Sequence, residues 1–202
     1  MNLRTELPTA ENSSNFNAVA DAATKAGTTL ENLKAAVAGE TGASAKYAAF
    51  AKAAKEQGFD QLARLWEATS AAEQIHINLE ASLVEAEDPS YTRPTAEAPA
   101  PEAIDLNLIA SANGEIFETS DMYPTFIKKA QEEGHAKAVK VFTRAKLAEA
   151  VHAEEYLEAY NNIDAADDDA YYLCPGCGYI HKGDDFEKCP ICGVPKAKFQ
   201  RF

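Results

Sequence analysis

Two short patterns that pair a glutamate with a histidine recur in this 202-residue sequence. "EQIH" places Glu73 three residues before His76, and "EAVH" places Glu149 three residues before His152. Side chains three apart lie on one face of a helix, and the neighbours in both windows are largely Ala, Ile, Leu and Val. We therefore expect both pairs on inward helix faces, where an unpaired carboxylate would cost several kcal/mol to bury.

Each Glu-x-x-His pattern is preceded by a Gly-Glu pair, at Glu40 and Glu115. "NLKAAVAGE" at 32–40 matches "NLIASANGE" at 107–115 with an offset of 75, and the two Glu-x-x-His patterns are offset by 76. One glutamate from each of two helices, with Glu-x-x-His from each of two others, is the ligand set of di-metal carboxylate bundles. The mixed oxygen and nitrogen donors favour iron, and manganese remains an alternative.

Four cysteines form a second candidate metal site near the end of the chain. Cys174 and Cys177 form one CxxC pair, and Cys189 and Cys192 form another after eleven residues. Four thiolates predict one tetrahedral metal ion, either iron or zinc. This spacing is typical of metal sites rather than of a disulfide framework.

The elements that must position these residues follow from the repeat. Two helical hairpins, joined by a proline-rich segment at 87–101, predict a four-helix bundle of the ferritin-like kind with one long crossover. The expected helices cover about 28–58, 60–86, 102–134 and 135–162. Thr28 and Glu31 have the spacing of a capping box at the first helix start. The expected domains are an N-terminal extension of unknown role (1–27), the bundle (28–165) and a cysteine domain (171–202).

Composition excludes several classes of function. The net charge of −13 would repel a phosphate backbone, so we expect no nucleic-acid partner. "MNLRTELPTA" lacks the apolar run of a signal peptide, and no stretch is apolar enough to span a membrane. With the CxxC usage, this predicts a cytoplasmic protein without a membrane partner.

Two tyrosines follow the Gly-Glu pairs at different distances. Tyr47 lies seven residues after Glu40, which returns it to within about 20° on a helix, whereas Tyr123 lies eight after Glu115 and overshoots by about 80°. The repeat offset also grows from 75 to 76 in this region. We therefore predict a one-residue π-bulge between Glu115 and Tyr123. The tyrosines are candidate hydrogen-bond donors to the ligands, or else ordinary core residues.

The motifs "AGE", "EQIH", "NGEIFE", "EAVH" and "CPGCGYIHKG…CPICGVPKAKF" together resemble the rubrerythrin family over residues 28–202. The resemblance implies a non-haem di-iron centre in the bundle and a small C-terminal rubredoxin-like domain, at 171–202, with one mononuclear iron on the four cysteines. It implies a peroxidase that reduces hydrogen peroxide to water in defence against oxidative stress. It also implies a head-to-tail homodimer, with electrons supplied by an external reductase or rubredoxin-like carrier. The implied bundle ligands are Glu40, Glu73, His76, Glu115, Glu118, Glu149 and His152.

Glu118 breaks the symmetry of the repeat, because Ala43 stands at the matching position. In the family this carboxylate binds one iron in the oxidised state and is replaced by the histidine that matches His76 on reduction. The resemblance therefore implies catalytic roles for Glu118 and His76. Tyr47 and Tyr123, or an unligated carboxylic acid, are the candidates for proton delivery.

Two other functions remain open from the sequence. Related bundles oxidise Fe(II) with oxygen, but iron handling does not require an electron-transfer site in the same chain, such as the cysteine module would provide. A non-enzymatic di-metal bundle with a structural zinc ribbon is the second alternative. The sequence contains neither GxGxxG nor a Walker A motif, so the peroxidase hypothesis requires an external source of electrons.

Overall fold

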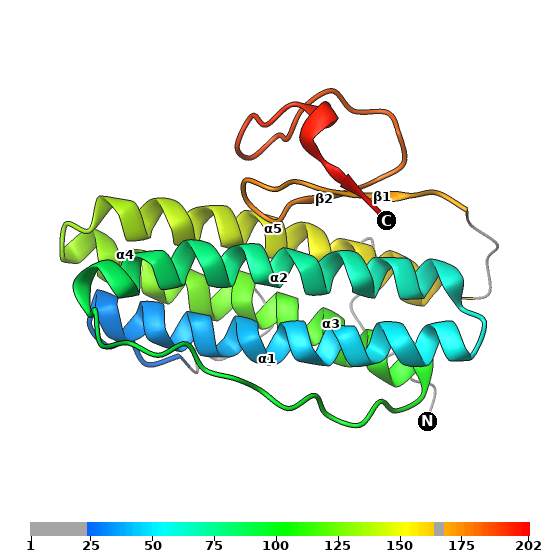
Figure 1. Cartoon of the computed structure of the whole chain (residues 1–202), viewed down its shortest axis with the longest axis horizontal. Coiled ribbons are helices and arrows are strands. Elements are labelled where there is room, and N and C mark those ends of the chain that lie inside the picture. Colours follow the sequence, from blue (N-terminus) through cyan, green and yellow to red (C-terminus); the bar gives the residue numbers. More distant parts are fainter. Residues whose placement is uncertain (1–23, 164–167) are drawn as a thin grey trace.

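The computed structural model describes residues 24–163 and 168–202 and consists mainly of helices laid side by side (Figure 1). Residues 1–23, most of the predicted N-terminal extension, lie outside the described residues. The helices are α1 (Thr29–Glu56), α2 (Asp60–Glu87), α3 (Ile104–Phe117), the π-helical η3 (Glu118–Met122), α4 (Tyr123–Glu132) and α5 (Ala136–Asn161). Because α3, η3 and α4 follow one another without a break, they form the third rod of a four-helix bundle.

Helix α1 begins with the predicted capping box. The backbone N–H of Glu31 donates to the Thr28 hydroxyl at 3.2 Å, and the Glu31 carboxylate accepts from the Thr28 N–H at 2.7 Å. These bonds satisfy two groups that the helix start would otherwise leave without partners.

The proline-rich crossover joins the end of α2 to the start of α3. Figure 1 shows it running along the length of the bundle, so that α2 and α3 point the same way. Its four prolines remove backbone donors and prevent a helix from continuing through the segment. The predicted bundle with one long crossover is confirmed.

The core of the bundle contains two aromatic-rich clusters. One is built around Trp66 and Tyr156, and the other around Phe126 and Phe142. Trp66 is fully buried, and its indole N–H donates to the Ser111 hydroxyl at 2.9 Å. The apolar faces of all four rods therefore meet in one interior.

The predicted π-bulge is confirmed by η3 (Glu118–Met122). A π-turn accommodates an extra residue, so Tyr123 returns to the helix face that carries Glu115 instead of overshooting it. The change in repeat offset thus marks a local change of helix type rather than a broken helix.

The cysteine module lies on one side of the bundle, above α2 and α5 (Figure 1). Strand β1 (Tyr171–Leu173) pairs with β2 (Ile180–Lys182) and β3 (Gln200–Arg201), both antiparallel, and a short 3-10 turn, η4 (Lys196–Lys198), precedes β3. Strand β1 contacts α2, and β2 contacts α2 and α5.

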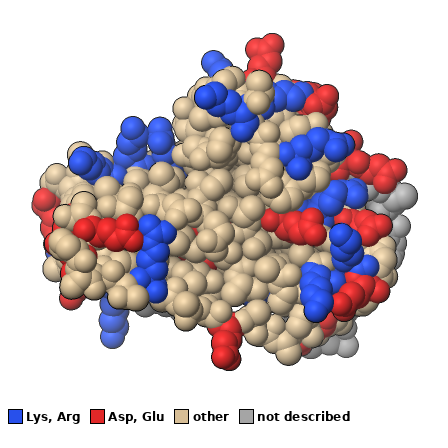
Figure 2. Space-filling model, viewed as in Figure 1, with Lys and Arg blue, Asp and Glu red and all other residues tan. Residues whose placement is uncertain are grey.

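Within residues 24–163 and 168–202, no helix has the length and apolar character that a membrane span requires. On the face shown in Figure 2, acidic and basic side chains are interspersed and form no continuous basic surface.

Candidate metal centres and their family

Six of the seven predicted bundle ligands meet in the interior, near the middle of their helices. They form two groups, Glu40, Glu73, His76 and Glu149, and Glu73, Glu115, Glu149 and His152. In each group the potential ligand atoms lie within 4.8 Å of one another, and all six side chains are at most 1% exposed. Glu73 and Glu149 belong to both groups, which is the arrangement that bridging carboxylates require.

Backbone carbonyl groups of the cysteine module determine the tautomers of His76 and His152. His76 Nε2 lies 3.0 Å from the backbone oxygen of Cys177, and His152 Nε2 lies 2.9 Å from that of Gly178. A carbonyl oxygen only accepts hydrogen bonds, so both Nε2 atoms must carry the hydrogen. Each Nδ1 therefore presents its lone pair to the carboxylates, as a metal-binding imidazole does.

The buried acidic atoms at the site lack ordinary partners. The two oxygens of Glu149 face the imidazoles, with Nδ1 of His76 2.6 Å from one and Nδ1 of His152 2.7 Å from the other. Single oxygens of Glu40, Glu73 and Glu115 are buried without a hydrogen-bond partner among the described residues. A pair of cations between the groups would satisfy these atoms, so the residues present fit a di-iron centre.

The pKa values of the ionisable groups at the site reflect burial and crowding. Burial, and then the neighbouring Glu149, hold the pKa values of Glu73 and Glu115 well above the usual range. Burial would also raise the pKa of Glu149, but His76 and His152 outweigh it and lower that pKa. Burial opposes protonation of His76, but Glu149 outweighs it and raises the pKa of His76. Such mutual dependence is expected where acidic groups share a buried space.

Glu118, the seventh predicted ligand, is only half-buried and belongs to neither group. It begins the π-helical segment η3. Burial, followed by the charges of Glu40 and Glu115, raises its pKa well above the usual range. In this arrangement His76, rather than Glu118, completes the group that contains Glu40.

Both predicted tyrosines bond to the candidate ligands. The Tyr47 hydroxyl donates to Glu115, and the Tyr123 hydroxyl donates to Glu40. Each of these hydrogen bonds thus connects the two hairpins, because Tyr47 and Glu40 lie on α1 whereas Tyr123 follows Glu115 in the third rod. Both rings are at most 1% exposed.

Glu80 is a further carboxyl group at the site that the sequence analysis missed. It is fully buried on α2, and its Oε1 atom lies 2.9 Å from the Tyr123 hydroxyl oxygen, within hydrogen-bond distance. Its spacing of seven residues from Glu73 was the available signal, since it places Glu80 on the same helix face. The other histidines have local partners: His135 caps α5 and contacts Glu87, and His181 bonds to Asp185.

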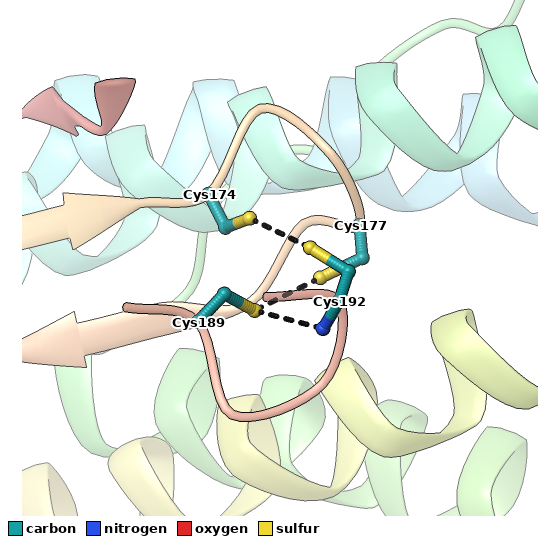
Figure 3. A group of neighbouring side chains, drawn as sticks. All are labelled: Cys174, Cys177, Cys189 and Cys192. Carbon is teal, nitrogen blue, oxygen red and sulfur yellow. Dashed lines mark hydrogen bonds between the residues drawn. The ribbon is translucent and has the colours of Figure 1, made fainter. Parts of the chain in front are cut away.

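The four cysteines converge in two matching turns (Figure 3). Cys174 Sγ lies 3.4 Å from Cys192 Sγ, and Cys177 Sγ lies 3.5 Å from Cys189 Sγ. These distances exceed an S–S bond of about 2 Å and approach the edge, about 3.8 Å, of a tetrahedral tetrathiolate site. The cysteines are free of disulfides, and all four sulfurs lie within 4.8 Å of one another.

The cysteine turns repeat the same backbone bonds. Gly178 N–H donates to the Cys174 carbonyl at 3.1 Å, and Gly193 N–H donates to the Cys189 carbonyl at 3.0 Å. A hydrogen bond with Cys177 lowers the pKa of Cys174 to about 5, whereas burial raises that of Cys189 to about 11. A metal ion would remove this inequality by holding all four sulfurs as thiolates.

A ferritin-like bundle with a buried carboxylate–histidine di-metal site, joined to a four-cysteine metal module, defines a class of non-haem iron protein. Residues 31–160 match the rubrerythrin family model, and residues 172–200 match the model of the rubrerythrin, rubredoxin-like domain. The chain belongs to the rubrerythrin family, whose members are generally oxidoreductases.

Individual relatives agree with this assignment. The chain is 67% identical to nigerythrin of Nitratidesulfovibrio vulgaris, with all of both chains covered. It is 34% identical to rubrerythrin of the same organism, with 87% of this chain and 95% of that protein covered. A solved structure described as the fully reduced, all-ferrous state of nigerythrin superimposes with a TM-score of 0.90, 67% identity and complete coverage of both chains.

Proposed function

We propose that this protein reduces hydrogen peroxide to water at a di-iron centre and receives the electrons through the iron of its cysteine module. The observation that carries the proposal is the direct docking of the module on the bundle site. Adjacent carbonyl groups, of Cys177 and Gly178, accept hydrogen bonds from the two candidate ligand histidines. A metal bundle that only stores iron has no need of such a connection.

The proposed ligand roles follow from the two groups. Glu73 and Glu149, which belong to both groups, would be shared by the two metal ions; Glu40 and His76 would complete the ligands of one ion, and Glu115 and His152 those of the other. Cys174, Cys177, Cys189 and Cys192 would hold the single iron. When bound, the di-iron pair supplies Lewis acidity and electrons to a peroxide.

Residues of the chain would then control the delivery of protons to the site and the access of water to it. Tyr123 and Tyr47 hold hydroxyl protons against Glu40 and Glu115 in an interior where both rings are buried. Protonation of the leaving oxygen is the contribution that general acids make to cleavage of an O–O bond. The surrounding helices keep bulk water away from this site.

Glu118 is proposed as the alternative ligand on the His76 side. It lies close enough to Glu40 for their charges to interact, while His76 occupies the ligand position. An anionic carboxylate suits ferric iron, and a neutral imidazole is tolerated by ferrous iron. Replacing Glu118 with Ala should leave iron content largely unchanged but slow turnover with peroxide, and unchanged turnover would refute this exchange.

Peroxide consumption under anaerobic conditions, with an artificial reductant, tests the proposed activity. We expect turnover by the iron-loaded protein, its loss in Glu149→Ala, and a large decrease in Cys189→Ser, which retains the bundle site. If oxygen with added Fe(II) supports faster turnover than peroxide does, the iron-handling alternative replaces the proposal. A colourless protein with zinc at the cysteines would favour the non-enzymatic alternative.

A head-to-tail homodimer remains part of the proposal, and an external reductase or rubredoxin-like carrier supplies the electrons. In the single chain the module rests on its own bundle. Mixed dimers of Glu149→Ala and Cys189→Ser subunits distinguish the two connections. Activity regained on mixing would mean that the module serves the partner's bundle, whereas no recovery would mean that it serves its own.

A further inference from the structure

Glu80 is a buried acidic residue to which neither the repeat nor the two metal groups assign a role. It lies on α2, seven residues after Glu73 and four after His76, so it shares their inward face. Its side chain is 0% exposed, but it belongs to neither four-residue group. A buried carboxyl group outside the ligand set requires its own explanation.

The hydrogen bonds of Tyr123 require one more proton than a tyrosine carries. Its hydroxyl oxygen lies 2.9 Å from Oε1 of Glu80 and is also hydrogen bonded to Oε1 of Glu40. A phenol has one hydrogen and can donate it only once. If Glu40 is a metal-bound carboxylate, it can only accept, so it takes the Tyr123 proton. The bond to Glu80 then exists only if Glu80 is itself protonated and donates to the phenol oxygen.

The surroundings of Glu80 also favour a neutral acid. Its Oε2 atom is buried and has no hydrogen-bond partner among residues 24–163 and 168–202. An ionised carboxylate with one bare oxygen in an interior is costly, whereas a carboxylic acid needs only one strong partner. Glu40 on α1, His76 on α2, Tyr123 on α4 and Glu149 on α5 are the ionisable groups that act on it. Burial, and then Glu40, raise the pKa of Glu80 well above the usual range.

The matching position at the other end of the site holds a different residue. An offset of 76 relates Glu73 to Glu149 and therefore relates Glu80 to Tyr156. The Tyr156 hydroxyl bonds to Thr69, not to Tyr47, although the rings of Tyr47 and Tyr156 lie 5.5 Å apart between centroids. Among residues 24–163 and 168–202, a second carboxyl group within hydrogen-bond distance of the tyrosine thus occurs only at the Glu40 end, where His76 and Glu118 are proposed to exchange.

We propose that Glu80 is a proton-holding positioning residue, whose protonated carboxyl group donates to the Tyr123 oxygen while the Tyr123 hydroxyl donates to Glu40. A shift of both protons by one bond would protonate the Glu40 oxygen, leave Tyr123 neutral and leave Glu80 as a carboxylate. One net proton moves, and no charge remains on the phenol. The functional consequence rests on the proposed peroxide reduction, but the protonation of Glu80 does not.

Infrared difference spectroscopy on the oxidised, iron-loaded protein tests the protonation directly. The carbonyl stretch of a protonated carboxyl group is separate from the bands of metal-bound carboxylates. We expect one such band to disappear in Glu80→Gln and to shift in Tyr123→Phe. Tyr47→Phe, the matched change at the other end, should leave it in place. A spectrum in which Glu80→Gln removes no acid band would overturn the proposal.

Glu80→Gln also tests the functional consequence, because an amide can still donate to Tyr123 but has no acidic proton. We expect unchanged iron content and peroxide turnover slower by about tenfold or more, with a changed solvent isotope effect. Iron loss in this variant would make Glu80 a ligand and overturn the proposal. Unchanged turnover and isotope effect would overturn the relay. If the wild-type protein fails to reduce peroxide, the infrared result still decides the protonation of Glu80.

Discussion

Glu73 and Glu149 differ from the other acidic residues of the site because each belongs to both candidate metal groups. Glu115, in contrast, belongs to one group and is also held by the Tyr47 hydroxyl. Membership of both groups or of one group thus distinguishes carboxylates that would bind both metal ions from those that would bind a single ion. It makes the bridging assignment open to measurement of metal content alone, without an activity assay.

Replacing Glu149 with Ala should abolish binding of both ions of the pair, since it removes a shared ligand. Glu115→Ala should lose chiefly the ion on the His152 side. Metal analysis per chain measures both variants, and the visible absorption of the cysteine-bound iron serves as an internal control for folding. If Glu149→Ala retains the metal content of Glu115→Ala, the bridging role is wrong.

At the scale of elements, helix ends and the π-turn set the positions of the ligands. The capping box fixes where α1 begins, eleven residues before Glu40. The π-turn brings Tyr123 back toward Glu40. The π-turn therefore determines where the Tyr123 hydroxyl lies at the candidate metal site.

Thr28→Ala should lower the free energy of unfolding by about 1 kcal/mol, because the α1 start loses its side-chain acceptor. Urea unfolding followed by Trp66 fluorescence measures the change. Thr95→Ala, in the exposed crossover, is the matched control and should stay within about 0.5 kcal/mol of the wild type. Equal effects of the two substitutions would show that the capping box does not stabilise α1.

Most of the bundle could be predicted from the sequence because its features repeat. Two copies of each motif identify the helices and six of the ligands, and the slip between 75 and 76 identifies the π-turn. Glu80 was missed for the same reason: its matching residue is Tyr156, and a lone glutamate in a helix looks like an exposed one. The bonds from His76 and His152 to the module carbonyls join residues distant in the chain and leave no local pattern.

At the scale of the molecule, the hydrogen bonds from the two candidate ligand histidines to the module both reach one cysteine turn, at Cys177 and Gly178. Gly178 has φ +75° and Gly193, at the same place in the other turn, has φ +79°. A Cβ at Gly178 would overlap the His76 imidazole, whereas at Gly193 no atom lies within 4 Å. The two glycines share one backbone requirement but differ in what lies beside them.

Gly178→Ala and Gly193→Ala should strain their turns by similar amounts, of order 1–3 kcal/mol, since both need a left-handed backbone. Only Gly178→Ala should also displace the module from His76. We expect it to slow electron transfer from the cysteine-bound iron about tenfold more than Gly193→Ala does, or about 1.4 kcal/mol of activation free energy. Identical rates in the two variants would mean that this contact does not carry the electrons.

The metal-free protein should lose stability as the pH rises from about 5 to 8. The folded-state pKa values of Glu73, Glu80 and Glu115 are raised above the pKa of about 4.3 that glutamate has in an unfolded chain. Their contribution to the free energy of unfolding is therefore complete below that pKa and is lost as the pH rises toward the folded-state pKa values. The raised pKa of His76 acts in the same direction, and the lowered pKa of Glu149 acts only at more acidic pH. Metal-loaded protein should show the opposite slope, because metals bind deprotonated ligands. Urea titrations at several pH values measure both slopes, and a rising stability of the metal-free protein contradicts this account.

Stopped-flow mixing of the fully reduced, iron-loaded protein with hydrogen peroxide, and separately with oxygen, tests the central claim most directly. We expect peroxide to oxidise the di-iron pair first and the cysteine-bound iron afterwards, and to act faster than oxygen does. Slow or absent oxidation of both centres by peroxide, or oxidation by oxygen alone, would contradict peroxide reduction as the function of this protein.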